Sequence, residues 1–125
     1  MSLWARWNRD TSPICSAIKE ATSAGIIVVA ASGNSNIDTS RFVPGGCSEA
    51  ITVWAVDENL NRAMFSNFWE KVDISAPGVG IYSSYPNNGY KSLNGTSMAT
   101  PHIVGIVSIL KTYNPNLQTK EIKQI

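Results

Sequence analysis

The most constraining feature of the sequence is residues 94–105, which read Asn-Gly-Thr-Ser-Met-Ala-Thr-Pro-His-Ile-Val-Gly. The small residues Gly95 and Thr96 form a turn, and apolar residues then recur at helical spacing as far as Tyr113. This pattern predicts a helix that begins close to Ser97 and packs one face against a core. A helix start presents unpaired N–H groups and the positive end of the helix dipole, which favour negative charge. The apolar residues at this spacing are Met98, Ile103, Ile106, Val107 and Leu110.

Ser97 has two chemical interpretations at this position. Its hydroxyl can be a nucleophile for acyl transfer, because the surrounding N–H groups can stabilise the negative charge that develops. It can equally be an N-cap that only satisfies backbone donors, which is the ordinary role of a Thr-Ser pair before an isolated helix.

A third interpretation of the same residues is the Gly-x-Ser-x-Gly turn of another class of serine hydrolases, which residues 95–99 nearly match. That turn needs an acid and then a histidine downstream of the serine. The sole histidine, His102, follows Ser97 on the predicted helix, about 140° round and about 7.5 Å along the axis. It cannot reach the serine hydroxyl, and we expect a packing and hydrogen-bonding role for it.

Taken together, residues 95–105 closely resemble the serine motif of the subtilisin-like serine peptidases, Gly-Thr-Ser-Met-Ala-x-Pro-His-x-x-Gly. The match is long and free of gaps. The resemblance implies that Ser97 is the nucleophile that forms the acyl-enzyme, and that protein or peptide chains are the substrates.

The composition is that of an ordinary globular protein of one domain. The 125 residues are 43% hydrophobic and 15% charged, with a formal net charge of +1. The charge balance shows no basic excess of the kind that would indicate a nucleic-acid partner. The longest apolar stretch, residues 25–31, is too short to span a bilayer. Residues 1–10 lack the hydrophobic region of a signal peptide. The chain therefore either starts in the cytosol or is a piece whose targeting signal lies elsewhere, and we expect the second.

The order of the predicted elements indicates an α/β protein with a partly parallel sheet. Ser12-Pro13 starts a helix that ends at Gly25, and the apolar run 26–31 is typical of a strand buried on both faces. A last helix begins near Thr119. Further strands are predicted at 50–56, 72–75 and 80–84, with a hairpin turn at 86–89. The resemblance implies a subtilisin-like three-layer fold with a mostly parallel sheet, incomplete in this chain.

The loop after the strand 26–31 reads Ser32-Gly33-Asn34. Ligands gather at the carboxyl ends of strands in open α/β sheets, although Gly-Asn alone is an ordinary turn. Residues 28–34 resemble the family segment Val-Val-Ala-Ala-x-Gly-Asn. The resemblance implies that the Asn34 side-chain amide and the Ser97 N–H donate to the oxygen that becomes negative at the tetrahedral intermediate.

The resemblance also implies a pocket for the substrate side chain. One wall is expected from the oxyanion loop, and the other from the N-terminal residues, which match the start of a family segment Ser-Leu-Gly-Gly. The residues expected to bind substrate are Ser2, Leu3, Ala31, Ser32, Gly33 and Thr96.

Three further segments fall in the family order, which extends the resemblance over nearly all of the chain: 50–53, 65–67 and 72–78. Asp73 stands where some members of the family bind structural calcium, and a plain surface aspartate is an equal interpretation. The chemistry itself is expected to need no cofactor.

The family places its catalytic residues in the order Asp, His, Ser, and the first two motifs would lie upstream of Met1. The aspartates of this chain all lie outside a matching motif: Asp10, Asp38, Asp57 and Asp73. Without a general base Ser97 is a poor nucleophile. We therefore expect residues 1–125 to be the C-terminal part of a single peptidase domain, inactive alone, whose partner is the missing N-terminal half. The alternative is a non-catalytic remnant that acts as a binding or structural module.

Secreted members of the family carry a disulfide at a position similar to that of Cys15 and Cys47, so the resemblance implies a Cys15–Cys47 bond. Two buried free thiols are the alternative. A disulfide would brace the loop of Asn34 and indicate an extracytoplasmic or secreted protein.

Three tryptophans, Trp4, Trp54 and Trp69, stand where the family usually has glycine, and Trp7 lies in a region that tolerates glycine. Such replacements are expected to overpack their surroundings. Two origins are open: UGA codons that the organism reads as glycine, or genuine substitution in a degenerating gene.

Overall fold

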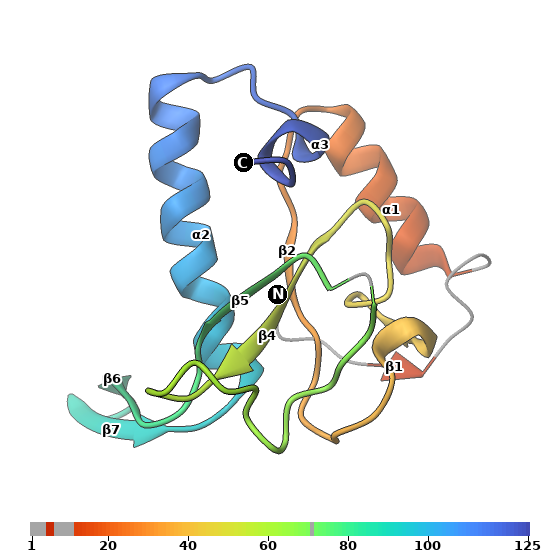
Figure 1. The fold of residues 1–125 in the computed structure, drawn as a ribbon. Coiled ribbons are helices and arrows are strands. Elements are labelled where there is room, and N and C mark those ends of the chain that lie inside the picture. The colour runs from red at the N-terminus through yellow and green to blue at the C-terminus, as the bar shows by residue number, and fades with distance from the viewer. Residues whose placement is uncertain (1–4, 7–11, 71) are drawn as a thin grey trace.

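The computed structural model describes residues 5–6, 12–70 and 72–125, and its centre is a three-stranded parallel sheet (Figure 1). The strands lie in the order β2-β4-β5, formed by Val29–Ala31, Ile51–Val56 and Ile74–Pro77. Helix α2 (Thr96–Tyr113) packs on one face and helix α1 (Pro13–Ser23) on the other. The expected α/β fold, with helices on both sides of a parallel sheet, is confirmed.

The core has two parts, one on each face of the sheet, because successive side chains of a strand point to opposite faces. Val29 faces α2 and its neighbour Ala30 faces α1. The part under α2 contains Val29, Ile51, Val53, Ala55, Ala63, Ala76, Ala99, Ile103 and Val107. The part under α1 contains Ile18, Ala30, Val43, Cys47 and Ala50. Five of the six residues of β4 are apolar, and all except Trp54 are buried, because both faces of the strand are covered.

Helix α2 begins one residue before Ser97, with Gly95 as its N-cap, close to the predicted start. Ile103 and Val107 of the predicted apolar face are buried. The prediction is wrong for Ile106, which is 51% exposed. The buried face follows the i, i+4 row through Ala99, and Ile106 lies about 100° from Val107 around the axis.

Helix α1 has the predicted boundaries: the Ser12 hydroxyl caps it by accepting from the Ile14 N–H at 3.2 Å. A disulfide joins Cys15 in its first turn to Cys47, with the two Cα atoms 5.4 Å apart. The structure therefore contains the bond that the resemblance implies. It ties α1 to the segment that leads into β4.

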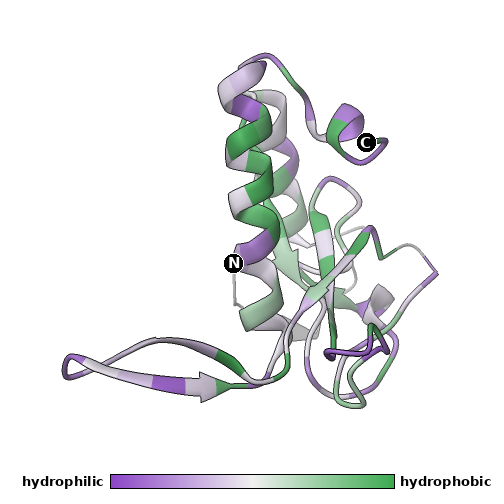
Figure 2. Ribbon diagram, turned by 60° about the vertical axis from the view of Figure 1, so that its left-hand side comes forward, coloured by the Kyte–Doolittle hydropathy of each residue, from purple (hydrophilic) through white to green (hydrophobic). Residues whose placement is uncertain are grey.

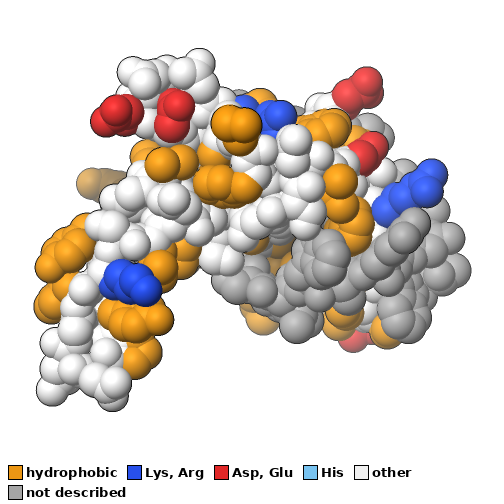
Figure 3. All heavy atoms as spheres, turned by 90° about the horizontal axis from the view of Figure 1, so that it is seen from below, with side chains coloured by type: hydrophobic (Ala, Val, Ile, Leu, Met, Phe, Trp, Pro, Cys, Tyr) orange, Lys and Arg blue, Asp and Glu red, His pale blue; other side chains and the backbone are white. Residues whose placement is uncertain are grey.

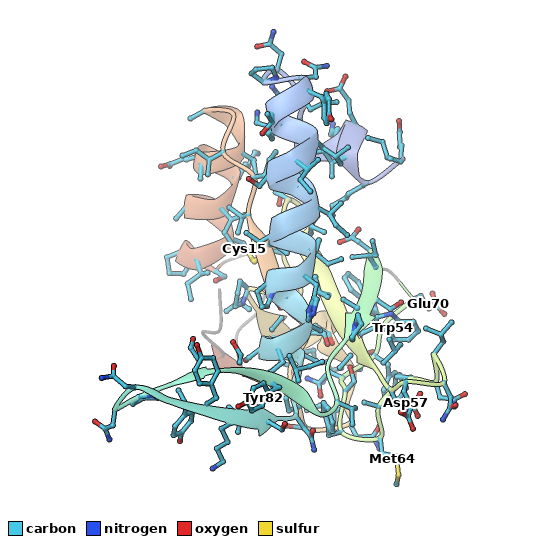
Figure 4. The ribbon with its side chains drawn as sticks, turned by 90° about the vertical axis from the view of Figure 1, so that its left-hand side faces the viewer. Cys15, Trp54, Asp57, Met64, Glu70 and Tyr82 are labelled. Carbon is cyan, nitrogen blue, oxygen red and sulfur yellow. A yellow bond between two sulfur atoms is a disulfide. The ribbon has the colours of Figure 1, made fainter. Side chains whose placement is uncertain are left out.

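The strands β6 (Ile81–Tyr85) and β7 (Gly89–Leu93) form an antiparallel hairpin that projects from the body (Figures 1 and 2). Asn87 and Asn88 make its turn with φ of 63° and 56°, a conformation that asparagine tolerates. Figure 3 shows hydrophobic side chains exposed along this arm. Figure 4 places Tyr82 on it, and the Tyr82 ring stacks on Tyr90 with centroids 5.5 Å apart.

Several smaller elements and boundaries differ from the prediction. Strand β2 is shorter than the predicted run 26–31. Strand β5 extends to Pro77, because an edge strand of the described sheet tolerates a residue without an N–H. The elements that the sequence analysis did not predict are β1 (Ala5–Arg6), the 3₁₀ turn η2 (Thr39–Arg41) and β3 (Phe42–Val43), with β1 and β3 paired antiparallel. The last helix, α3, spans Thr119–Ile122. Among the described residues, no helix is both long and apolar enough to cross a membrane.

The two described tryptophans at expected glycine positions are both only partly buried. Trp54 lies in β4 opposite Ser75 of β5, and Figure 4 labels its position. Because Trp54 and Trp69 are not enclosed in the core, the overpacking expected from the sequence does not arise in this structure. Trp4 and Trp7 lie outside the described residues.

Candidate active site

Ser97 lies in the first turn of α2, where it is half-buried. Within the described residues, neither its hydroxyl nor its N–H has a hydrogen-bond partner, so both groups are free to meet a ligand. The residue before the helix is Gly95, and a Cβ there would lie 3.4 Å from the Asn34 Nδ2. The absence of that side chain keeps the space beside the Asn34 amide open.

Asn34 follows β2, and its side chain reaches the start of α2. Its Oδ1 accepts hydrogen bonds from the Thr96 N–H and from the Thr96 hydroxyl, each at 2.8 Å. Because the oxygen end of the amide is held in this way, the Nδ2 end is the one that remains to donate. The two expected oxyanion donors therefore lie on adjoining segments. The Asn34 amide is bonded to Thr96, and the second donor is the N–H of Ser97, the residue that follows Thr96.

Thr96 links the two segments a second time. Its hydroxyl accepts from the Gly33 N–H at 3.2 Å while it donates to Asn34. Thr96 is fully buried, so its side of these hydrogen bonds is shielded from water. The side chain is committed to the scaffold of the site, and any contact with substrate would be made through its backbone.

The residues expected to line a substrate wall, Ala31, Ser32 and Gly33, precede Asn34. The Ser32 side chain is buried, and its hydroxyl donates to the Asn67 carbonyl at 3.3 Å. The Ser32 N–H and C=O are also engaged within the protein, so this residue could shape a wall without donating or accepting there. Gly33 has a φ of +106°, which a residue with a side chain rarely adopts. Ser2 and Leu3 lie outside the described residues.

Asp57 and Asp38 each accept hydrogen bonds from the backbone of their own turn. Asp57 Oδ1 accepts from the N–H groups of Asn59 and Asn61, both at 2.9 Å. Asp38 caps η2 by accepting from the Ser40 N–H at 2.7 Å. This hydrogen bond holds the pKa of Asp38 below its usual value.

His102 was expected to pack and to form a hydrogen bond, and the structure shows the hydrogen bond alone. Its Nδ1 lies 2.9 Å from the Met98 carbonyl oxygen, one helical turn earlier. The side chain is exposed, so the expected packing role is wrong. The position on α2 faces solvent because the buried row of the helix passes through its neighbour Ile103. His102 therefore makes a local backbone contact and none with Ser97.

The residues around Asp73 do not fit a calcium ion. Asp73 Oδ1 pairs with the Lys123 ammonium at 3.0 Å, and Oδ2 accepts from the Thr52 N–H at 2.7 Å. Calcium takes six to eight oxygen ligands, several of them carboxylates. In the part of the chain that the structure describes, no three His, Cys, Asp or Glu side chains gather to hold a metal. We derive no step from a metal here.

Asn67 is a functional candidate that sequence reasoning missed. It is fully buried, and its side chain makes hydrogen bonds to residues on both sides of Asn34. The sequence carries only a weak signal for this role: residues 65–67 fall in the family order, but nothing in Phe-Ser-Asn tells which backbone groups the Asn67 side chain meets.

Comparison with known proteins agrees with this geometry. A sequence model of the Subtilase family (Peptidase_S8) matches residues 1–125. Alkaline elastase YaB of Bacillus sp. (strain YaB) is 48% identical over 107 residues, which is 86% of this chain and 28% of that protein. Subtilisin Savinase of Lederbergia lenta is 47% identical over 86% of this chain and 39% of its own length. The chain thus spans well under half of these relatives.

A solved structure, of a cold adapted subtilisin-like serine proteinase, has a TM-score of 0.92 and 33% identity to this chain. The match covers 99% of this chain and 44% of that protein. Sequence, fold and the paired positions of Ser97 and Asn34 lead to the same conclusion: the chain belongs to the subtilase family of serine peptidases.

Proposed function

We propose that this chain is the C-terminal part of a subtilisin-like serine endopeptidase domain, with Ser97 as the nucleophile. The observation that carries the proposal is the attachment of the Asn34 amide to the start of α2, where Ser97 lies. In this mechanism the Ser97 hydroxyl attacks a peptide carbonyl and gives up its proton to a general base supplied by the upstream segment. The tetrahedral intermediate then expels the amine, which takes that proton, and the acyl-enzyme left on Ser97 is hydrolysed by water.

Asn34 and Ser97 together would stabilise the oxyanion of that reaction. The Asn34 Nδ2 and the Ser97 N–H are donors that the described residues leave unused. Donors fixed before the reaction need no reorganisation when the negative charge develops, which lowers the barrier. No cofactor is needed for these steps.

The proposal requires an upstream segment that supplies the catalytic histidine and aspartate. Among the described residues, the one histidine is His102, and it contacts Met98 rather than Ser97. The isolated chain would therefore lack a general base, and we expect it to be inactive on peptides.

The surface of the chain supports the existence of such a segment. Helix α2 exposes apolar residues away from the sheet as well as burying them against it (Figure 2). They are Val104, Ile106, Ile109 and Tyr113. A helix that is apolar around most of its circumference is typically covered on several sides.

The Cys15–Cys47 disulfide supports a secreted or extracytoplasmic location for the protein, since such bonds persist in oxidising compartments. The targeting signal would belong to the upstream sequence.

The test is covalent labelling with a fluorophosphonate, which reacts with activated serines. The full-length protein that contains this chain is treated with the probe, and the modified peptide is located by mass spectrometry. Labelling on Ser97, absent from a Ser97→Ala variant and from the isolated chain, supports the proposal. An unlabelled Ser97 in the folded full-length protein contradicts it. Ser92→Ala, on the exposed hairpin, is the matched control and should leave labelling unchanged.

The second candidate function is a non-catalytic binding or structural module. The absence of a general base near Ser97 among the described residues favours it. A gene that begins at Met1, without upstream Asp and His motifs, would support the module and exclude the peptidase.

A further inference from the structure

The loop that carries Asn34 lies beside residues 65–68, which we call the bracing segment. Four backbone hydrogen bonds join the two segments. They run from the N–H of Asn36 to the C=O of Phe65 (2.9 Å), Asn67 to Gly33 (2.8 Å), Phe68 to Ile37 (3.1 Å) and Thr39 to Phe68 (2.9 Å). The loop is therefore held along its length by a partner that follows β4 in the chain.

The Asn67 side chain adds three hydrogen bonds that lie on both sides of Asn34. Its Nδ2 donates to the Ser32 carbonyl at 3.0 Å, two residues before Asn34. Its Oδ1 accepts from the N–H groups of Ser35 at 2.9 Å and Ile37 at 3.2 Å, after Asn34. Asn67 is 0% exposed, whereas Asn34 itself is exposed.

A carboxamide is the group that suits this position, because it offers a donor and an acceptor on one rigid plane. An aspartate would keep the acceptor but would present a carboxylate oxygen to the Ser32 carbonyl. An apolar side chain would remove the acceptor of the Ser35 and Ile37 N–H groups and the donor to the Ser32 carbonyl, three hydrogen bonds in all. The requirement comes from the loop backbone, since Asn67 has no hydrogen bond to Asn34.

We infer that Asn67 is a positioning residue that holds the backbone of residues 32–37 so that the Asn34 amide meets the oxyanion. The inference rests on the proposed function of Asn34. Asn34 then has two anchors: Thr96 fixes its side-chain oxygen, and Asn67 fixes the backbone on both sides of it. Oxyanion donors act only when placed within tenths of an ångström, so loss of either anchor should weaken the transition state more than the substrate complex.

The first experiment needs no activity and uses the unaltered full-length protein that contains this chain. Amide hydrogen exchange is followed by NMR at Ser35 and Ile37, which lie on an exposed loop. The inference predicts that both amides exchange at least about tenfold more slowly than unstructured amides, because Asn67 Oδ1 is their acceptor. Exchange at the unprotected rate would overturn it, whatever any variant does.

The second experiment compares Asn67→Ala with Thr52→Val in the same protein. Thr52 is 2% exposed, and its hydroxyl donates to the Gly45 carbonyl at 2.8 Å, so its loss removes a buried hydrogen bond from β4. Asn67→Ala should remove the protection of Ser35 and Ile37 while Val53 of the core stays protected. Equal loss in both variants would mean that Asn67 acts through general stability, and the inference would fail.

The third experiment measures kinetics in the full-length protein. Asn67→Ala should lower kcat by about tenfold or more with little change in KM, whereas Thr52→Val should change neither below the unfolding temperature. In an Asn34→Ala background, Asn67→Ala should cause no further loss of kcat. An undiminished effect in that background would show that Asn67 does not act through Asn34.

The two proposals fail in different ways. A full-length protein that folds but hydrolyses no peptide contradicts the proposed function, while protected Ser35 and Ile37 amides would still support the bracing of the loop. An active protein whose kcat is indifferent to Asn67→Ala contradicts the positioning role alone.

Discussion

Asn34 and Thr96 are 62 positions apart in the sequence, and two hydrogen bonds of 2.8 Å join them. One comes from the Thr96 backbone and the other from its hydroxyl, and both end on the same oxygen of the Asn34 amide. This relationship orients the amide with its nitrogen available, because an amide oxygen with two donors cannot exchange places with its NH₂ group without leaving them unpaired. The link between the loop after β2 and the start of α2 is the structural basis of the candidate site.

Replacing the Thr96 hydroxyl should therefore reduce catalysis in the full-length protein. Thr96→Val keeps the shape of the side chain but loses the hydrogen bonds to Asn34 and Gly33. We expect kcat to fall by about tenfold with KM nearly unchanged, the effect of losing about 1.4 kcal/mol of positioning. Steady-state kinetics measure it, and Thr96→Ser should restore most of the rate.

The control for this variant is Thr112→Val, which removes a hydroxyl that donates to the Ser108 carbonyl further along α2. It should leave kcat unchanged. A Thr96→Val protein with full kcat would contradict the orienting role of the hydroxyl.

The two faces of α2 should differ sharply in their contribution to folding. Ile103 is 4% exposed and Ile106 is 51% exposed, although they lie on the same helix. Ile103→Ala should cost about 2–5 kcal/mol of unfolding free energy, and Ile106→Ala less than about 1 kcal/mol in the isolated chain. Urea denaturation compares them. Equal losses would mean that the packing of α2 on the sheet is wrong.

The disulfide should contribute strongly to the stability of a chain of this size. Cys15 and Cys47 are 32 positions apart, and closing a loop of this length corresponds to about 3–4 kcal/mol in the chain-entropy account. The double variant Cys15→Ala and Cys47→Ala should lose about this much in urea denaturation. Reducing agent should destabilise the parent chain and leave the double variant unchanged. A loss below about 1 kcal/mol would contradict the prediction.

Asp38 should contribute to the folding stability at neutral pH, and this contribution should disappear at acidic pH. Its pKa is lowered in the folded chain because the carboxylate accepts from the Ser40 N–H. The charged form therefore stabilises the fold at neutral pH, and this contribution is lost as the pH falls through the lowered pKa. Because the side chain is exposed, Asp38→Ala should cost at most about 1 kcal/mol at pH 7.

Thermal unfolding at a series of pH values tests this point. The difference between the parent chain and Asp38→Ala should shrink below about pH 4. A difference that grows as the pH falls would have the wrong sign for a capping carboxylate.

The sequence predicts the elements whose signals are local. Ser12-Pro13 marks the start of α1, the apolar strand β4 is buried on both faces, and Gly95 precedes α2. Helix caps and continuous apolar runs depend on neighbouring residues in the chain, so they can be predicted without knowledge of the tertiary structure. Ile106 shows the limit, because spacing alone does not tell which apolar row of a helix meets the sheet.

The candidate site was partly predictable for the same reason. Ser97 and Asn34 stand in motifs that resemble a known family, and each lies at the end of a predictable element. Asn67 was not predictable, because its function depends on hydrogen bonds to Ser32 and to Ile37, which come together only when the bracing segment lies beside the loop. The same applies to Asp73, whose carboxylate is paired with a lysine from the far end of the chain.

The measurement that tests the account most directly is peptide hydrolysis by the full-length protein, compared with its Ser97→Ala variant and with the isolated 125-residue chain. The account predicts turnover of a peptide amide by the full-length protein, no turnover by Ser97→Ala, and none by the isolated chain. Turnover that survives Ser97→Ala, or a folded full-length protein without any activity, would contradict it.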